Sequence, residues 1–85
     1  MDLEYEYSYI LITHSQYEEL AAFPIVQDQF SSNTVNFDGG QYHYCLASAF
    51  DIQGYDGDDY EALEAMILSF RHGIFTDSGR YHWQW

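Results

Sequence analysis

Two short glycine-containing turns set the main constraint on how this chain folds. The Asp-Gly-Gly turn at residues 38–40 separates two β-favouring segments, 34–37 and 41–49, and its glycines can supply the positive φ angles that a tight hairpin needs. The Asp-Ser-Gly sequence at 77–79 suits a type I turn followed by a left-handed glycine, which predicts a second hairpin within residues 73–85. Two hairpins predict an antiparallel sheet.

The N-terminal segment, residues 3–13, alternates with a period of two and is predicted to be a strand. One face carries aromatic and aliphatic side chains and is expected to pack on the core: Leu3, Tyr5, Tyr7, Tyr9 and Leu11. The other face begins with Glu4 and Glu6 and becomes apolar at Ile10 and Ile12, as expected if the second half of the strand is covered on both sides. Residues 41–49, apolar on both faces, are predicted to be a central strand.

A first helix is expected after this strand. Ser15 and Glu18 fit a capping box, in which Glu18 also stands in the first turn, and residues 16–23 continue as a short helix. Pro24 either ends this helix or starts a second turn, and residues 25–30 are compatible with helix or strand.

The second helix is predicted over residues 58–72, with Asp58 and Glu61 as an N-terminal cap and Gly73 as the stop. Its apolar face has helical spacing and comprises Tyr60, Leu63, Met66, Ile67 and Phe70. A core-facing stripe of this kind orients the remaining faces of the helix toward solvent.

The resulting order is strand, helix, strand, strand, helix, strand, in a single domain of residues 1–85. This order predicts a small α+β fold with two helices on an antiparallel sheet and room for an extra C-terminal strand. The ferredoxin-like βαββαβ arrangement fits this order, as do other antiparallel sheets with one or two helices. Trp83 is expected to seal the core, whereas Trp85 fits either the core or an exposed interface.

The chain combines a foldable composition with extreme acidity. Its 85 residues are 47% hydrophobic and 20% aromatic, which a disordered acidic tail would not be. Fourteen Asp and Glu face only two bases, Arg71 and Arg80, for a formal net charge of -12. Such a charge repels nucleic acid and anionic membrane, so neither is expected as a direct partner, and it attracts basic proteins.

No catalytic motif is present, so an enzyme is not expected, and no cofactor is predicted. The four histidines are scattered without metal-ligand spacing. Cys45 is the only cysteine, which excludes an intramolecular disulfide; a buried, inert thiol is favoured over a reactive one. There is no signal-peptide pattern and no run of about 18 apolar residues, so the cytoplasm is the expected compartment, that of the host if the gene is carried by a phage.

Acidic residues concentrate in the stretch 51–64, DIQGYDGDDYEALE, which holds six of the fourteen. Asp58, Glu61 and Glu64 recur at i, i+3 and i+6, so on a helix they form a ladder of carboxylates. Glu4 and Glu6 lie two residues apart on a strand, about 7 Å from each other and close to the spacing of phosphates. The candidate partner-binding residues are therefore Glu4, Glu6, Asp51, Tyr55, Asp56, Asp58, Asp59, Tyr60, Glu61 and Glu64.

Two other interpretations of the acidic stretch remain open. Residues 51–59 offer oxygen ligands for calcium in a loop with glycines, although the EF-hand pattern is absent. The charge is also compatible with a merely solvated surface or with halophilic adaptation, but neither predicts the aromatic content or the concentration of acid in one loop and helix.

In length, charge and the segment DGDDYEALE, the chain resembles the small acidic phage-encoded inhibitors, the anti-CRISPR and anti-restriction DNA mimics. This resemblance of type implies a stoichiometric inhibitor that occupies the basic nucleic-acid-binding surface of a CRISPR effector, restriction enzyme or other nuclease. An immunity protein or antitoxin against a basic nuclease toxin is the alternative, since its surface would be equally acidic. The oligomeric state stays open, a dimer included.

Overall fold

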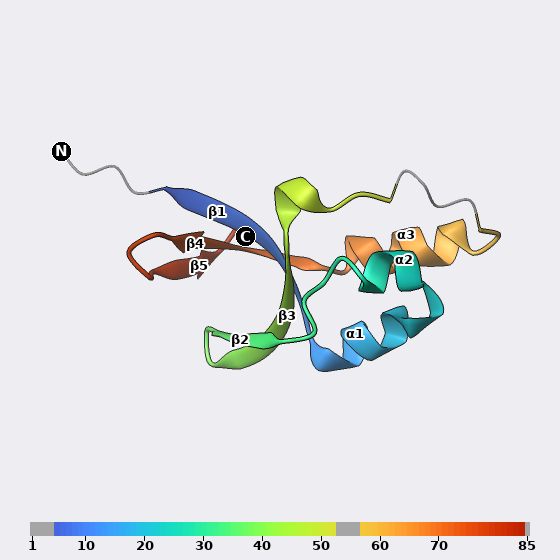
Figure 1. The fold of residues 1–85 in the computed structure, drawn as a ribbon, viewed down its shortest axis with the longest axis horizontal. Helices are drawn as coiled ribbons and strands as arrows, with labels where there is room; N and C mark the ends of the chain where they lie inside the picture. Colours follow the sequence, from blue (N-terminus) through green and yellow to red (C-terminus); the bar gives the residue numbers. More distant parts are fainter. Residues whose placement is uncertain (1–4, 53–56, 85) are drawn as a thin grey trace.

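Five antiparallel strands form one sheet in the computed structural model, which describes residues 5–52 and 57–84. Their order is β2-β3-β1-β4-β5, with β1 at the centre between β3 and β4 (Figure 1). The strands are β1 (Glu6–Ile12), β2 (Thr34–Phe37), β3 (Gly40–Leu46), β4 (Arg71–Thr76) and β5 (Tyr81–Trp83). Together with the helices, this sheet confirms the predicted α+β class and both hairpins.

The helices occupy the two long connections between strands. β1 leads to β2 through α1 (His14–Glu19), the 3₁₀ turn η1 (Leu20–Ala22) and α2 (Pro24–Gln27), and β3 leads to β4 through η2 (Ala47–Ala49) and α3 (Tyr60–Leu68). Because β3 lies between β1 and β2, the strand order follows the predicted βαββαβ arrangement, with β5 as the extra strand. The helices gather at one end of the molecule, and the turn between β4 and β5 lies at the other (Figure 1).

The first helix begins earlier than predicted, because β1 ends at Ile12 and the chain turns at once. Thr13 is the N-cap: its Oγ1 accepts a hydrogen bond from the backbone N–H of Gln16 at 3.1 Å. In return, the backbone N–H of Thr13 donates to Oε1 of Gln16 at 2.8 Å. The Ser15–Glu18 box was therefore wrong by two residues. Glu18 lies near the end of α1, where its Oε1 is 2.8 Å from Nε2 of His14.

The second helix is shorter than the predicted 58–72. α3 runs over Tyr60–Leu68, and Asp59 at the N-cap position makes no side-chain capping bond. Gly73, expected as the helix stop, lies inside β4, which pairs with β1 from Arg71 onward. The backbone hydrogen bonds of this long-range pairing displace the last helical turn, which local sequence alone favours.

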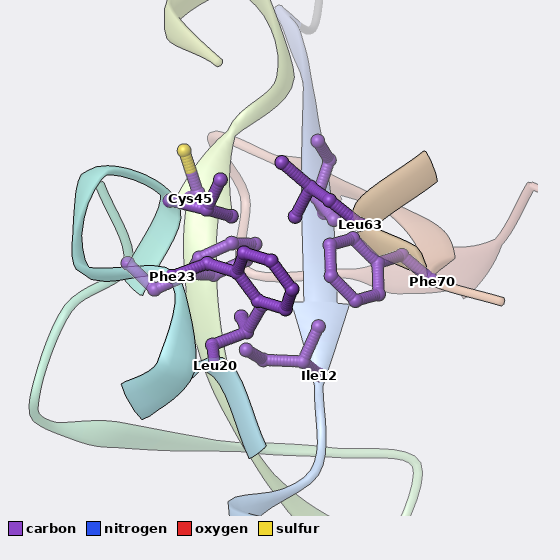
Figure 2. Packing of buried hydrophobic residues seen from close by; sticks show 9 residues of the cluster. Ile12, Leu20, Phe23, Cys45, Leu63 and Phe70 are labelled. Atoms are coloured by element: carbon purple, nitrogen blue, oxygen red, sulfur yellow. The ribbon is translucent and has the colours of Figure 1, made fainter. Parts of the chain in front are cut away.

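Both faces of the second half of β1 are buried, as predicted: Ile10, Leu11 and Ile12 are at most 4% exposed. Ile10 and Ile12 contact the helices, whereas the tyrosine face, expected to be the core side, points away from them. Figure 2 shows side chains from β1, β3 and the helical segments meeting in this helix-side core. Its buried members are Ile10, Ile12, Leu20, Phe23, Val26, Phe30, Cys45, Leu63 and Phe70.

The tyrosine face forms a second, aromatic core because the sheet curls until its two edges meet. The ring of Phe37 in the edge strand β2 lies 4.3 Å from the ring of Trp83 in the opposite edge strand β5, measured between centroids. Nε1 of Trp83 donates a 3.0 Å hydrogen bond to Oδ2 of Asp38. Phe37 is completely buried. Trp83 therefore does cover apolar surface, but on the face opposite the helices.

The turn that closes the β2–β3 hairpin needs two residues with positive φ. Asp38 has φ of 52° and Gly39 has φ of 83°, as in a type I′ turn, whereas the sequence predicted positive φ for the glycines alone. The hairpin thereby holds Asp38 within reach of Trp83. β3 ends at Leu46 rather than at Ala49, because Ala47–Ala49 forms η2.

The aromatic core leaves no room for a side chain at position 73. A Cβ at Gly73 would lie 2.6 Å from Cζ of Phe37 and 2.7 Å from Cδ1 of Leu11. Gly73→Ala is therefore expected to lower the free energy of unfolding by about 1–3 kcal/mol, measured by urea denaturation. Gly40→Ala is the matched control with a smaller expected loss, because its nearest contact is the ring of Tyr42 at 2.9 Å, which can rotate away. Equal losses would contradict this account.

Candidate partner-binding surface

Helix α3 turns its carboxylates to solvent because its apolar side packs on the helix-side core. Leu63 is completely buried in the helix-side core, with Met66 and Ile67 packed beside it. Glu61 and Glu64 are consequently exposed, and at i, i+3 their Cβ atoms lie about 5–6 Å apart. Glu61 also stands in the first turn, where the helix dipole favours a negative charge.

The predicted ladder of three carboxylates is present only in part. Asp58 and Asp59 are exposed in the turn before the helix, so they continue the negative charge without sharing the helical spacing of Glu61 and Glu64. Tyr60, the first residue of α3, is 42% exposed. These five residues form one continuous acidic segment at the start of α3.

Leu68 belongs to the same surface and is not among the residues predicted from the sequence. It is 80% exposed, the most exposed of the large apolar side chains in residues 5–52 and 57–84. Together with Glu61, Glu64 and Ala65 it borders a shallow depression on the outer side of α3. The signal was its position seven residues after Glu61, which returns it to the same helix face. We call Glu61, Glu64, Ala65 and Leu68 the α3 surface.

The acidic character extends across the whole helical end of the molecule. Gln29, just after α2, accepts a 2.8 Å hydrogen bond from the backbone N–H of Asp51 and donates one of 2.6 Å to its carbonyl oxygen, which joins the two connections. Among the described residues, the helices and their adjoining turns carry the acids Glu18, Glu19, Asp28, Asp51, Asp58, Asp59, Glu61 and Glu64. The described parts of these connections contain no Arg or Lys.

Both arginines belong to the sheet. Arg71 is the first residue of β4, and Arg80 precedes β5. The guanidinium carbon of Arg71 lies 3.6 Å from the centroid of the Trp83 ring, so this cation is stacked on the aromatic face. The described helical connections thus carry acids without a base, whereas the sheet and its turns carry both signs: Arg71 and Arg80 with Glu6, Asp38 and Asp77.

The structure separates one predicted site residue from the rest. Glu6 begins β1, opposite Thr76 at the end of β4, whereas α3 lies at the other end of the molecule (Figure 1). Glu6 therefore does not extend the acidic surface around α3. Asp51 is exposed at the helical end. Three further predicted residues, Glu4, Tyr55 and Asp56, lie outside the described residues.

Two of the histidines meet although 29 residues separate them. Nδ1 of His14 lies 3.0 Å from Nε2 of His43, and Nδ1 of His43 lies 2.9 Å from the carbonyl oxygen of Ser31. A carbonyl only accepts, so Nδ1–H of His43 donates to Ser31. The Tyr17 ring stacks on His43 with centroids 4.0 Å apart. Buried His43 thus ties β3 to α1.

No metal site or reactive thiol emerges from the described residues. In 5–52 and 57–84, no three His, Cys, Asp or Glu side chains are grouped so that they could hold a metal ion. The calcium interpretation falls on residues 51–59, of which 53–56 lie outside this part. Cys45 is buried as predicted, and burial raises the pKa of its thiol, which lowers the fraction of reactive thiolate.

Comparison with known proteins assigns the chain to no group: no family model, curated protein or solved structure matches it. Among the described helices, none combines the length and apolar character needed to cross a membrane. The inference of function therefore depends on the surface chemistry described above.

Proposed function

We propose that this chain is a stoichiometric protein inhibitor that binds the basic nucleic-acid-binding surface of another protein and blocks access of the nucleic acid by charge mimicry. The observation that carries the proposal is the α3 surface, where exposed carboxylates stand at helical spacing in a region whose described residues include no Arg or Lys. The class of target is a CRISPR effector, restriction enzyme or other nuclease, as the resemblance in type implies.

Charge and apolar contact contribute to binding on this surface in different ways. Complementary charge speeds encounter with a basic groove and fixes the orientation of the two proteins. Leu68 and Tyr60, exposed beside the carboxylates, supply apolar contact at the centre of such an interface. A folded surface that has both carboxylates and apolar anchors can therefore compete with nucleic acid for the same groove.

The cytoplasm is the compartment we propose, because the targets in question act there and the single cysteine provides no disulfide. The immunity or antitoxin alternative uses the same acidic surface. It differs in the partner, which would be a toxin nuclease encoded beside this gene.

A competitive elution experiment tests the proposal. Host lysate is bound to DNA-cellulose, and the column is washed with the purified chain; we expect a discrete nucleic-acid-binding protein to elute in a stoichiometric complex. Poly-glutamate at the same concentration of carboxylates is the control for charge alone and is expected not to elute it. Binding of the eluted partner to the chain, measured without DNA, should weaken as salt rises, since exposed charges are screened within about 10 Å at 0.1 M.

Two results would overturn the proposal. One is a complex whose partner still binds its nucleic acid with unchanged affinity. The other is an elution profile that poly-glutamate reproduces, because a specific surface would then be unnecessary.

A further inference from the structure

The aromatic face of the sheet contains a hollow away from the helices. Near β2 and β5 this face is closed by the contact of Phe37 with Trp83. Closer to the beginning of β1 it stays open, with a volume of about 360 Å³. We call it the tyrosine hollow; it is lined by Tyr7, Tyr9, Val35, Tyr44, Phe75 and Thr76.

Aromatic rings at right angles form the walls of the tyrosine hollow. The ring of Tyr9 lies 6.1 Å from that of Tyr44 at an interplanar angle of 79° and 5.4 Å from that of Phe75 at 89°. Tyr7, which is 44% exposed, stands at the rim. The π faces of aromatic rings carry a negative potential that attracts cations, and phenol oxygens can accept hydrogen bonds from N–H groups.

The charge of the protein decides which ligand suits this hollow. With a formal charge of -12, the chain repels anions and a second copy of itself, whereas it draws a cation toward any of its surfaces. Aromatic walls without a positive residue among them then favour a cationic group over a neutral one.

The same face already binds one guanidinium group of its own. Arg71 and Trp83 share the aromatic face, because Gly73, which pairs with Trp83, lies two residues along β4 from Arg71. The guanidinium of Arg71 stacks over the Trp83 ring at 3.6 Å. Stacking of a planar guanidinium on a ring is therefore a contact that this sheet makes, and arginine makes such contacts more readily than lysine.

We propose that the tyrosine hollow is a binding site for the guanidinium group of an arginine side chain presented by a protein partner. This site is separate from the α3 surface and uses a different kind of contact. It adds a requirement for a properly placed arginine to the general attraction between an acidic protein and a basic one.

A pair of matched probes tests the site. N-acetyl-arginine amide and its neutral isostere N-acetyl-citrulline amide are titrated into the protein, and NMR shifts of the tyrosine ring signals are followed. We expect the arginine probe to move the signals of Tyr7, Tyr9 and Tyr44 in a saturable way and to bind about fivefold or more tightly than citrulline. Equal binding of the two probes, or shifts confined to Tyr60, would overturn the proposal.

Variants separate ring stacking from attraction to acid. Tyr44→Leu is expected to weaken arginine binding about fivefold, and Tyr44→Phe, which keeps the ring, to retain it. Tyr60→Leu is the matched control on α3 and should leave binding unchanged. The double variant Glu61→Lys with Glu64→Lys should lose the elution activity proposed above while keeping the shifts at the hollow, so the two proposals can fail independently. Loss of binding in Tyr44→Phe would contradict the role of the ring.

Discussion

Replacing Leu63 with alanine is expected to lower the free energy of unfolding by about 2–5 kcal/mol. Leu63 is completely buried, and it is the only buried residue of α3, so its side chain is the main attachment of this helix to the helix-side core. The loss combines the transfer of the side chain from the core with the cavity that remains. Urea denaturation followed by far-UV circular dichroism measures it.

Leu68→Ala provides the control for this variant. Both residues are leucines of the same nine-residue helix, but Leu68 is 80% exposed, so its replacement is expected to change the free energy of unfolding by less than about 0.5 kcal/mol. Similar losses in the two variants would contradict the orientation of α3. Because Leu68 is an apolar anchor of the α3 surface, its replacement should instead weaken binding to the proposed partner.

Reversing the two charges of α3 is expected to cause the largest loss of binding. In the variant Glu61→Lys with Glu64→Lys, two attractive contacts to a basic groove become repulsive, and like charges in an interface cost several kcal/mol. We expect the concentration needed to elute the partner from DNA-cellulose to rise roughly 100-fold, equivalent to about 2.7 kcal/mol. Neither side chain is buried, so the circular dichroism spectrum should stay that of the folded protein.

The matched control changes the same net charge at the other end of the molecule. Glu6 and Asp77 are exposed near the turn between β4 and β5, far from α3 (Figure 1). Glu6→Lys with Asp77→Lys is expected to weaken elution much less, because only long-range attraction is reduced. If both double variants lose activity equally, net charge rather than the α3 surface governs binding.

The two hairpins and the strand β1 were predictable because their causes are local. Each turn has a glycine with positive φ: Gly39 with φ of 83° in the first turn and Gly79 with φ of 91° in the second. Alternation with a period of two marked β1, and β3 proved to be an internal strand as predicted. The turns and the alternation depend on neighbours within a few residues, whereas the internal position of β3 was predicted from apolar residues on both of its faces.

The boundaries of the helices were less predictable because distant segments compete for the same residues. Arg71 and His72 favour a helix end by their charge, but β1 supplies them with strand partners at Leu11 and Ile10. A ladder of backbone hydrogen bonds outweighs a few tenths of a kcal/mol of helix preference. The position of the first cap likewise depends on where β1 stops.

The candidate site likewise has one part that was predictable from local sequence and another that depends on distant segments. The acidic stretch and the exposure of Glu61 and Glu64 were predictable from helical spacing, because the apolar residues of one helix must face the core. Leu68 was absent from that prediction, since its exposure depends on how far the core extends along α3. The tyrosine hollow had no signal beyond the alternation in β1, because its walls come from four strands.

By itself, the sequence determined the class of fold, the two hairpins and an acidic helix, all of which depend on turn geometry, periodicity and charge. Only the tertiary structure decided which face of β1 meets the helices and that the sheet curls until Phe37 meets Trp83. Both faces of β1 are apolar enough to be buried, so the choice depends on which segments reach each face. That is a property of the whole sheet and not of any segment within it.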